Sequence, residues 1–267
     1  MFDNSISCCG LKSNTSHAFF RADCLLEFII LPPVIHHGNI AEEEAFSKLQ
    51  FLKMAQENKL HLICLDLEGV LVPEIWIAFS TATGIPEFRR TTRDEPDYNK
   101  LMNYRIELLT KHGLKLTDIQ KVIGGLEPLP GAMEFVQYLR KKTQFVILSD
   151  TFEEFAHPLM AHLGYPTLLC NSMQIADDGS IKGYNLRQQN GKKMAVEAFK
   201  KLNFSVFAAG DSYNDLAMIE EADSGCLFRA PGSILKEYPH LPFADTYEDF
   251  QKIIDAFLAT PIDKHPE

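Results

Sequence analysis

The stretch ICLDLEGVLV, from Ile63 to Val72, combines the pattern of a buried strand with two carboxylates. Its apolar residues are typical of a strand that is covered on both faces. Asp66 and Glu68 lie at its end, one residue apart, directly before Gly69. Two anions this close resist burial together, because each charge makes the other harder to ionise. The pattern therefore predicts a cation at the end of this strand.

The composition indicates a globular chain with a full core. Of the 267 residues, 46% are hydrophobic and 23% charged, which suits one domain of ordinary size plus an insertion. The net charge of −10 argues against a nucleic-acid partner, because nucleic-acid phosphates need a basic surface. No apolar run reaches the roughly 18 residues that predict a membrane span. The six cysteines show no metal-ligand spacing, which suits a protein of the reducing cytoplasm.

From His61 onward, strand-like segments alternate with helical ones. After a first strand from His61, four more strands are expected at Thr143–Asp150, Pro166–Asn171, Phe204–Asp211 and Ser224–Ala230. Helices are expected at Gly131–Lys142, Thr151–Gly164 (bent or restarted at Pro158), Gly191–Leu202 and Ser212–Ala222, and a β-hairpin at residues 172–186. Strands and helices in this order require right-handed crossovers. We therefore expect an α/β fold, a Rossmann-like parallel sheet with helices on both faces.

The segment between the first two long strands is too long for a simple crossover. Residues 74–130 show helical periodicity without a good strand, and Thr117 is the expected N-cap of one helix. We interpret this segment as a helical cap inserted after the first strand. The other predicted parts are a core of residues 60–73 and 131–260, a non-catalytic N-terminal extension of residues 1–59 and a tail of residues 261–267.

Polar residues gather where the predicted strands end. Ser149 and Asp150 close one strand, Asp211 closes another, and Asn214 and Asp215 follow in the next turn. Parallel strands bring their carboxyl ends to one edge of the sheet, where ligands of such folds bind. These acids should therefore meet the two carboxylates that follow the first strand. A hard divalent cation such as Mg²⁺ would relieve their repulsion, because it prefers oxygen ligands.

One of these carboxylates is also suited to attack a phosphoryl group. Asp66 can form an aspartyl-phosphate, which divides a difficult hydrolysis into two easier steps. Glu68 lies on the same side of an extended chain, so it can protonate the leaving oxygen and then deprotonate the attacking water or alcohol. The Ser149 hydroxyl, N–H groups at a helix N-terminus and a lysine from the segment GKKMAVEAF can hold the phosphoryl group.

Four short motifs in this order, DLEGV, SDT, GKK and GDSYND, resemble those of the haloacid dehalogenase-like superfamily of phosphatases. The resemblance runs from Leu60 to Phe250 and includes the cap segment TTRDEPDY, where it is similar to the members that act on phosphoserine. It implies a cytoplasmic, Mg²⁺-dependent enzyme that hydrolyses O-phospho-L-serine, with homoserine as an alternative acceptor of the phosphoryl group. Glu68 departs from the superfamily's usual second Asp, and its extra methylene bears on the choice between these acceptors.

The resemblance also implies a role for each matched residue. Asp66 is then the nucleophile and, with Asp211, a Mg²⁺ ligand, while Glu68 is the proton donor whose main-chain carbonyl binds the metal. Ser149 and Lys192 then hold the phosphoryl group, and Glu74 and Arg105 in the cap read the amino acid part of the substrate. Asp150, Asn214 and Asp215 complete the expected substrate-binding residues, with Asn214 and Asp215 supporting the site. Lys193 is the alternative to Lys192.

Other interpretations compete with this one. Arg105 lies among polar neighbours and can equally belong to a solvated helix face. The chain can also be a phosphatase for another small phosphomonoester, or a catalytically silent binding protein of the same fold. A silent relative should have lost the nucleophile, the lysine or Asp211, and all three are present. The sequence leaves open the main acceptor and the oligomeric state.

Overall fold

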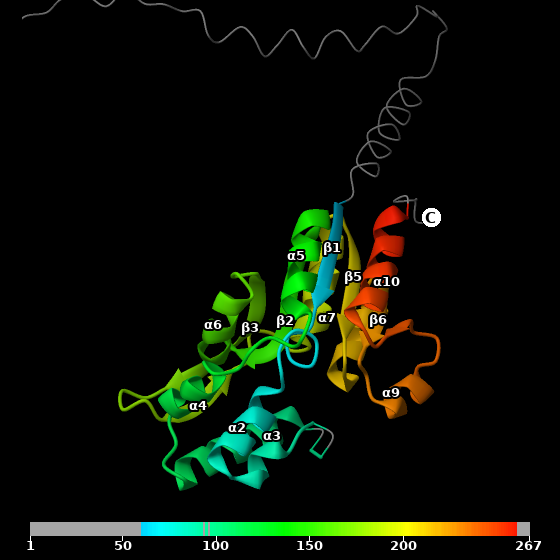
Figure 1. The fold of residues 1–267 in the computed structure, drawn as a ribbon. Coiled ribbons are helices and arrows are strands. Elements are labelled where there is room, and N and C mark those ends of the chain that lie inside the picture. Colours follow the sequence, from blue (N-terminus) through cyan, green and yellow to red (C-terminus); the bar gives the residue numbers. More distant parts are fainter. Residues whose placement is uncertain (1–59, 93, 96, 261–267) are drawn as a thin grey trace, which may run out of the picture. The chain divides into compact units, whose positions relative to one another are not determined.

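The computed structural model describes residues 60–92, 94–95 and 97–260, and these form an α/β fold (Figure 1). The predicted extension and tail, residues 1–59 and 261–267, lie outside the described residues. Seven strands form one sheet in the order β4-β3-β2-β1-β5-β6-β7. Their bounds are β1 Leu60–Leu65, β2 Gln144–Phe152, β3 Thr167–Ile175, β4 Ile181–Asn185, β5 Phe204–Gly210, β6 Ser224–Phe228 and β7 Phe243–Ala244. All neighbouring pairs are parallel except β3 and β4, so the predicted parallel sheet is confirmed.

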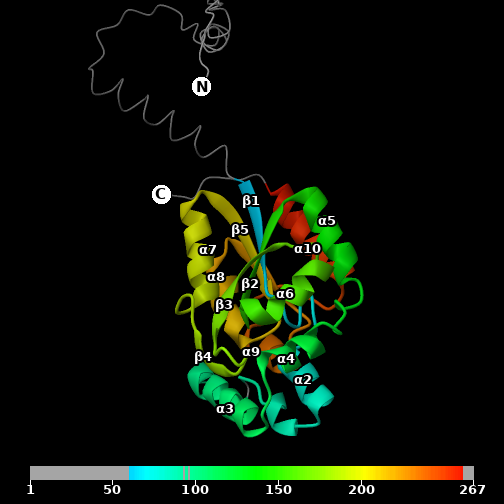
Figure 2. The same ribbon diagram turned by 90° about the vertical axis from the view of Figure 1, so that its left-hand side faces the viewer.

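Helices cover both faces of this sheet (Figure 2). Successive residues of a strand point to opposite faces, so Ile63 and Leu65 pack in one core and Leu62 and Cys64 in another. The first core includes side chains of α5 (Ala132–Lys142), α6 (Glu153–His162) and α10 (Tyr247–Ala259). The second includes side chains of α7 (Gly191–Lys201), α8 (Leu216–Glu221) and α9 (Gly232–Glu237). Burial on both faces explains why the central strands are almost wholly apolar.

Four helical elements between β1 and α5 lie beyond the carboxyl ends of the strands (Figure 1). They are α2 Ile75–Thr83, the 3₁₀ turn η1 Pro86–Arg89, α3 Tyr98–Lys111 and α4 Leu116–Ile123. Trp76 anchors them, because its ring packs on Phe88 at 5.7 Å and on Phe155 of α6, also at 5.7 Å between centroids. The inserted segment is therefore helical and packs on the strand-and-helix core, while its status as a separate cap domain stays a prediction.

The structure corrects the prediction for α6. The helix begins at Glu153 rather than Thr151, because β2 continues to Phe152, and it runs past Pro158 without restarting. Proline lacks the N–H that would bond to the carbonyl four residues earlier. Here that carbonyl, of Glu154, accepts a hydrogen bond of 2.9 Å from the Gln120 side chain of α4. The inserted helices thus satisfy a carbonyl that the proline leaves free.

Two further helix boundaries differ from the prediction. Thr117 lies inside α4, whose N-cap is Lys115, because the Asp118 carboxylate accepts from the Lys115 N–H at 2.8 Å. The expected helix Ser212–Ala222 is a 3₁₀ turn, η2 (Tyr213–Asp215), followed by α8. The side chain of Asp215 bonds to the N–H groups of residues 211 and 212, which tightens the first turn.

The hairpin predicted at residues 172–186 is present as the antiparallel pair β3 and β4. Its turn contacts α4, since the Leu116 N–H donates to the Gly179 carbonyl at 3.1 Å. The sequence interpretation assigned no element to residues 231–260, where the structure has α9, β7 and α10. Among the helices of the described residues, none is long and apolar enough to cross a membrane.

Candidate active site

The turn after β1 places Asp66 at the centre of the sheet edge. The Asp66 N–H donates to the Ala209 carbonyl of β5 at 3.0 Å, and the Leu67 N–H donates to Asp66 Oδ1 at 2.8 Å. Gly69 in this turn has a φ of +75°, and a Cβ built there would lie 2.5 Å from Asp211 Oδ2. Only glycine therefore combines this backbone conformation with so close an approach of Asp211.

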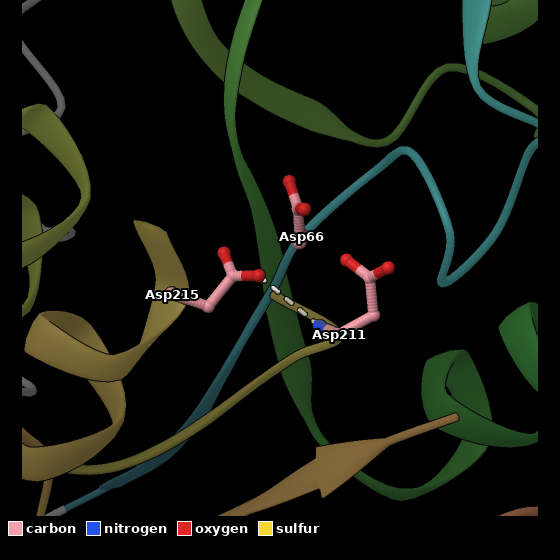
Figure 3. Close-up of side chains that lie close together, drawn as sticks. All are labelled: Asp66, Asp211 and Asp215. Carbon is pink, nitrogen blue, oxygen red and sulfur yellow. Dashed lines mark hydrogen bonds between the residues drawn. The ribbon is translucent and has the colours of Figure 1, made fainter. Parts of the chain in front are cut away.

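Three carboxylates meet at this edge: Asp66 after β1, Asp211 after β5 and Asp215 in η2 (Figure 3). One oxygen from each lies within 4.8 Å of the others. Burial and the charge of Asp215 raise the pKa of Asp66 well above its usual value, although Lys192 opposes this. Burial and Asp215 also raise the pKa of Asp211 to about 7. The cluster carries more negative charge than its surroundings balance, and hard oxygen donors of this kind fit Mg²⁺.

Asp215 has its own partners in this cluster. Its Oδ1 accepts from Lys192 at 2.7 Å, and its Oδ2 accepts from the N–H groups of Asp211 and Ser212 at 3.1 and 3.0 Å. Figure 3 marks the bond from Asp211. Because its oxygens are engaged, Asp215 can orient its neighbours, whereas Asp66 and Asp211 are better placed to hold a metal. The predicted ligand role of the Glu68 carbonyl stays a prediction.

Lys192, in the first turn of α7, lies among these acids. Its Nζ is 2.9 Å from Asp66 Oδ1 and 3.7 Å from Asp150 Oδ2. Burial lowers the pKa of Lys192, but the attraction of Asp215, Asp66 and Asp150 outweighs burial and raises it. Lys193 instead pairs with Glu197 and Glu221, 3.7 and 3.5 Å away. Of the two lysines left open by the sequence, Lys192 is therefore the one beside the carboxylates.

Ser149 and Asp150 lie near the end of β2, beside this cluster. Ser149 is buried, and its Oγ accepts a hydrogen bond from the Thr151 N–H at 3.2 Å. The Asp150 side chain is partly exposed and accepts from Asn214 Nδ2 at 2.8 Å. The serine hydroxyl hydrogen is thus free to donate to a ligand, while Asn214 fixes the direction of the Asp150 carboxylate.

Glu68 points toward the inserted helices. Its Oε2 accepts from the Ile75 N–H at 2.8 Å, at the N-terminus of α2. Burial, with the charge of Glu74 in second place, raises the pKa of Glu68 to about 8, while the Ile75 N–H and Arg105 work against this shift. A carboxyl group with this pKa holds a proton near neutrality, so it can act as an acid.

Arg105 of α3 is buried, so the interpretation as a solvated face is wrong. Its guanidinium lies 4.6 Å from the centre of the Trp76 ring, and its Nη2 donates to the Arg90 carbonyl at 2.8 Å. Among the described residues, its Nε is a buried side-chain nitrogen without a hydrogen-bond partner. Burial lowers the pKa of Arg105 to about 10, while the negative charges of Glu68 and Glu74 oppose this shift. An unpaired buried donor of this kind suits an anionic ligand.

Glu74 lies near both Glu68 and Asp211. It is the N-cap residue of α2, and its charge raises the pKa of both Glu68 and Asp211. The structure therefore brings all the predicted site residues to one edge of the sheet and the helices beyond it. Their roles in catalysis stay predictions.

The sequence interpretation missed two side chains at this edge. Tyr98 of α3 and Asn171 of β3 both donate to the Asp150 carbonyl, at 2.9 and 3.1 Å. Asn171 carried a signal, because it is a polar residue at the end of an apolar strand, as Ser149 is. Tyr98 carried none, since a tyrosine early in an inserted helix is as typical of packing as of function.

Comparisons with known proteins identify the family of this chain. Residues 60–223 match the model of the haloacid dehalogenase-like hydrolase family. The chain is 55% identical over 193 residues to phosphoserine phosphatase ThrH of Pseudomonas aeruginosa, covering 72% of this chain and 94% of the relative. It is 52% identical over 201 residues to phosphoserine phosphatase of Pseudomonas syringae pv. tomato, covering 75% of this chain and 85% of the relative.

A solved structure supports the fold. The phospho-aspartyl intermediate analogue of a phosphoserine phosphatase superposes with a TM-score of 0.61 at 21% identity, covering 74% of this chain and 99% of that chain. At this identity the likeness concerns the fold alone. The family match and the two Pseudomonas relatives together show that the chain belongs to the haloacid dehalogenase-like hydrolases.

Proposed function

We propose that this protein is a Mg²⁺-dependent phosphoserine phosphatase that hydrolyses O-phospho-L-serine to serine and phosphate. The carrying observation is the Asp66 carboxylate, which lies 2.9 Å from Lys192 and beside Asp211. Asp66 can act as the nucleophile, and Lys192 supplies a fixed positive charge for the phosphoryl group. The relatives named phosphoserine phosphatase, at 55% and 52% identity, support the same substrate.

In the proposed reaction, an oxygen of Asp66 attacks phosphorus, and the bond from phosphorus to the serine oxygen breaks. Glu68 gives its proton to that leaving oxygen, which its pKa of about 8 allows near neutral pH. Glu68 is then a carboxylate and takes a proton from water, which attacks the aspartyl-phosphate. This second step releases phosphate and restores Asp66 and the protonated Glu68.

Asp66 and Asp211 would hold the metal through their carboxylates, with the Glu68 carbonyl as a further ligand. When bound, Mg²⁺ supplies positive charge that offsets the carboxylates and polarises the phosphoryl oxygens. Lys192 and the Ser149 hydroxyl hold the same phosphoryl group from the protein side. Asp215 fixes Lys192 by accepting a hydrogen bond from its Nζ at 2.7 Å. Asn214 orients the Asp150 carboxylate, which lies 3.7 Å from the same Nζ.

In this proposal, residues of the inserted helices bind the amino-acid part of the substrate. The buried guanidinium of Arg105, with its unpaired Nε, is suited to the substrate carboxylate. Glu74 supplies the negative charge that the substrate ammonium group requires. A phosphomonoester without these two groups would lose both interactions, which favours phosphoserine over other small phosphomonoesters.

The test is phosphate release from phosphoserine by the full chain and by Asp66→Asn. The wild type should turn over phosphoserine with Mg²⁺ and stop in EDTA, and Asp66→Asn should be inactive, because an amide cannot form the acyl-phosphate. Turnover near the wild-type rate in Asp66→Asn would place the nucleophile elsewhere. Absence of phosphoserine turnover in the wild type would reject the substrate.

Homoserine is the second proposed acceptor. Glu68 is longer than the Asp usual at this position, and an acid displaced outward can serve an alcohol as well as water. Phosphate release should then fall as homoserine is added, with O-phosphohomoserine appearing in equal amount. Unchanged phosphate release would leave water as the sole acceptor.

A further inference from the structure

The peptide group between Asp150 and Thr151 is held on both sides. Its carbonyl accepts from Tyr98 Oη at 2.9 Å and from Asn171 Nδ2 at 3.1 Å. Its N–H donates to Ser149 Oγ at 3.2 Å. A carbonyl oxygen has two acceptor positions, so these two donors occupy it fully. The orientation of this peptide is therefore set by side chains from two other elements.

An irregularity of the sheet explains why side chains are needed here. The register between β2 and β3 shifts between Leu148 and Phe152, so residues 149–151 leave the regular ladder. A main-chain carbonyl released in this way needs another donor if it is buried. Asn171 is the donor from the core, and its own Oδ1 is fixed by the Arg187 N–H at 3.1 Å. Tyr98 is the donor from the inserted helix α3.

We propose that Tyr98 is a positioning residue, which aims the Ser149 hydroxyl at the phosphoryl group by fixing the peptide between Asp150 and Thr151. This inference rests on the proposed function, because it assumes that Ser149 holds a phosphoryl group. The Thr151 N–H occupies one lone pair of Ser149 Oγ, so the hydroxyl hydrogen must turn away from it. Rotation of the peptide would free the hydroxyl from this constraint.

The surroundings of Tyr98 suit this role. Burial, together with Asp150, raises the pKa of its hydroxyl, so the group keeps its proton and donates. The Tyr98 ring meets the Tyr184 ring of β4 edge to face at 5.9 Å, which holds it against the core. Through this one hydroxyl, helix α3, which also carries Arg105, is joined to the phosphoryl-binding serine. Recognition of the amino acid and placement of Ser149 thus depend on the same helix.

The experiment compares Tyr98→Phe, Ser149→Ala and the double variant. Tyr98→Phe removes one hydroxyl and keeps the ring, so kcat should fall about five- to tenfold, with both phosphoserine and para-nitrophenyl phosphate. The fall in kcat should be the same for both substrates, because Ser149 holds the phosphoryl group that they share. In the Ser149→Ala background, Tyr98→Phe should lower kcat by less than about twofold, because the hydroxyl that Tyr98 positions is already absent.

Tyr138→Phe is the matched control. It removes a tyrosine hydroxyl of α5 that donates to the Gln251 carbonyl of α10 and not to Asp150, so activity should not change. Melting temperatures show whether each variant folds. Unchanged kcat in Tyr98→Phe, or an equal loss with and without Ser149, would overturn the inference, since a purely structural role gives the second result.

Binding of inorganic phosphate separates this inference from the proposed function. Calorimetry with Mg²⁺ should show weaker phosphate binding by Tyr98→Phe, and little further weakening in the double variant relative to Ser149→Ala. If the wild type binds phosphate without hydrolysing phosphoserine, the proposed function fails while this comparison still tests Tyr98. If the wild type hydrolyses phosphoserine but Tyr98→Phe binds phosphate as tightly as the wild type does, this inference fails while the proposed function stands.

Discussion

Lys192 Nζ lies 2.9 Å from Asp66 Oδ1, whereas the next residue, Lys193, pairs with the glutamates Glu197 and Glu221. Two adjacent lysines of one helix thus have different surroundings, because neighbouring side chains of a helix do not share a face. Lys192 is buried among carboxylates, and the Lys193 side chain is 40% exposed. This difference provides a pair of substitutions that change the same residue type with different expected effects.

Lys192→Met should lower kcat by about a hundredfold or more, because it removes a fixed positive charge from the phosphoryl site. Lys193→Met, the control, should retain activity, since exposed ion pairs contribute little. Steady-state kinetics with phosphoserine measure both, and circular dichroism shows whether each variant folds. If Lys193→Met lost more activity than Lys192→Met, the assignment of the phosphoryl contact to Lys192 would be wrong.

Several polar residues of this site were predictable from the sequence, because their position depends only on where the strands end. Asp66, Ser149 and Asp211 each follow an apolar run, and a parallel sheet brings such ends together. The choice of Lys192 over Lys193 was not predictable from spacing. It depends on the rotation of α7 about its axis, which long-range packing sets.

Residues of the inserted helices were harder to place. Arg105 has polar sequence neighbours, and its burial depends on Trp76, a residue of another helix. The bond from Tyr98 to Asp150 joins residues 52 positions apart, which no local pattern reveals.

Helix α10, by contrast, could have been predicted from the sequence. Thr246 is its N-cap, whose side chain accepts from the Asp249 N–H, and apolar residues follow at helical spacing.

The metal-free protein should become less stable as pH rises through the pKa of Asp211. That pKa is about 7 in the folded protein against 3.8 as the ordinary value. Between these values the folded state binds a proton that the unfolded chain has released, so the free energy of unfolding falls as pH rises. The fall should be on the order of 2 kcal/mol, and saturating Mg²⁺ should remove most of it by pairing with the carboxylates.

Urea unfolding at pH 5 and pH 8, in EDTA and in Mg²⁺, measures this difference. Asp211→Asn is the control, because an amide does not titrate, and its metal-free stability should change less over the same pH range. The same pH dependence in EDTA and in Mg²⁺ would show that the acidic cluster does not bind the ion.

Arg105→Ala should discriminate between substrates. It should lower kcat/KM for phosphoserine about tenfold to a hundredfold, the effect of losing a hydrogen bond to a charged group, and spare para-nitrophenyl phosphate, which has no carboxylate. Arg105→Lys keeps a charge above Trp76 but loses the planar fork of donors, so its loss should be intermediate. Equal losses with both substrates would mean that Arg105 supports the fold or the phosphoryl site.

A protein that begins at Met54 should retain activity. The family match and the described structure both begin at residue 60, and β1 is already paired on its two sides by β2 and β5. The candidate active site follows the other end of β1, at Asp66, and the sequence pattern gives residues 1–53 no catalytic role. One feature argues against a dispensable extension. The apolar run Cys24–Ile35 lies outside the described residues, and apolar stretches of this length commonly cover other apolar surface. Equal melting temperature and equal kcat/KM in the truncated and full chains are expected, whereas a melting temperature lower by several degrees would mean that residues 1–53 stabilise the core.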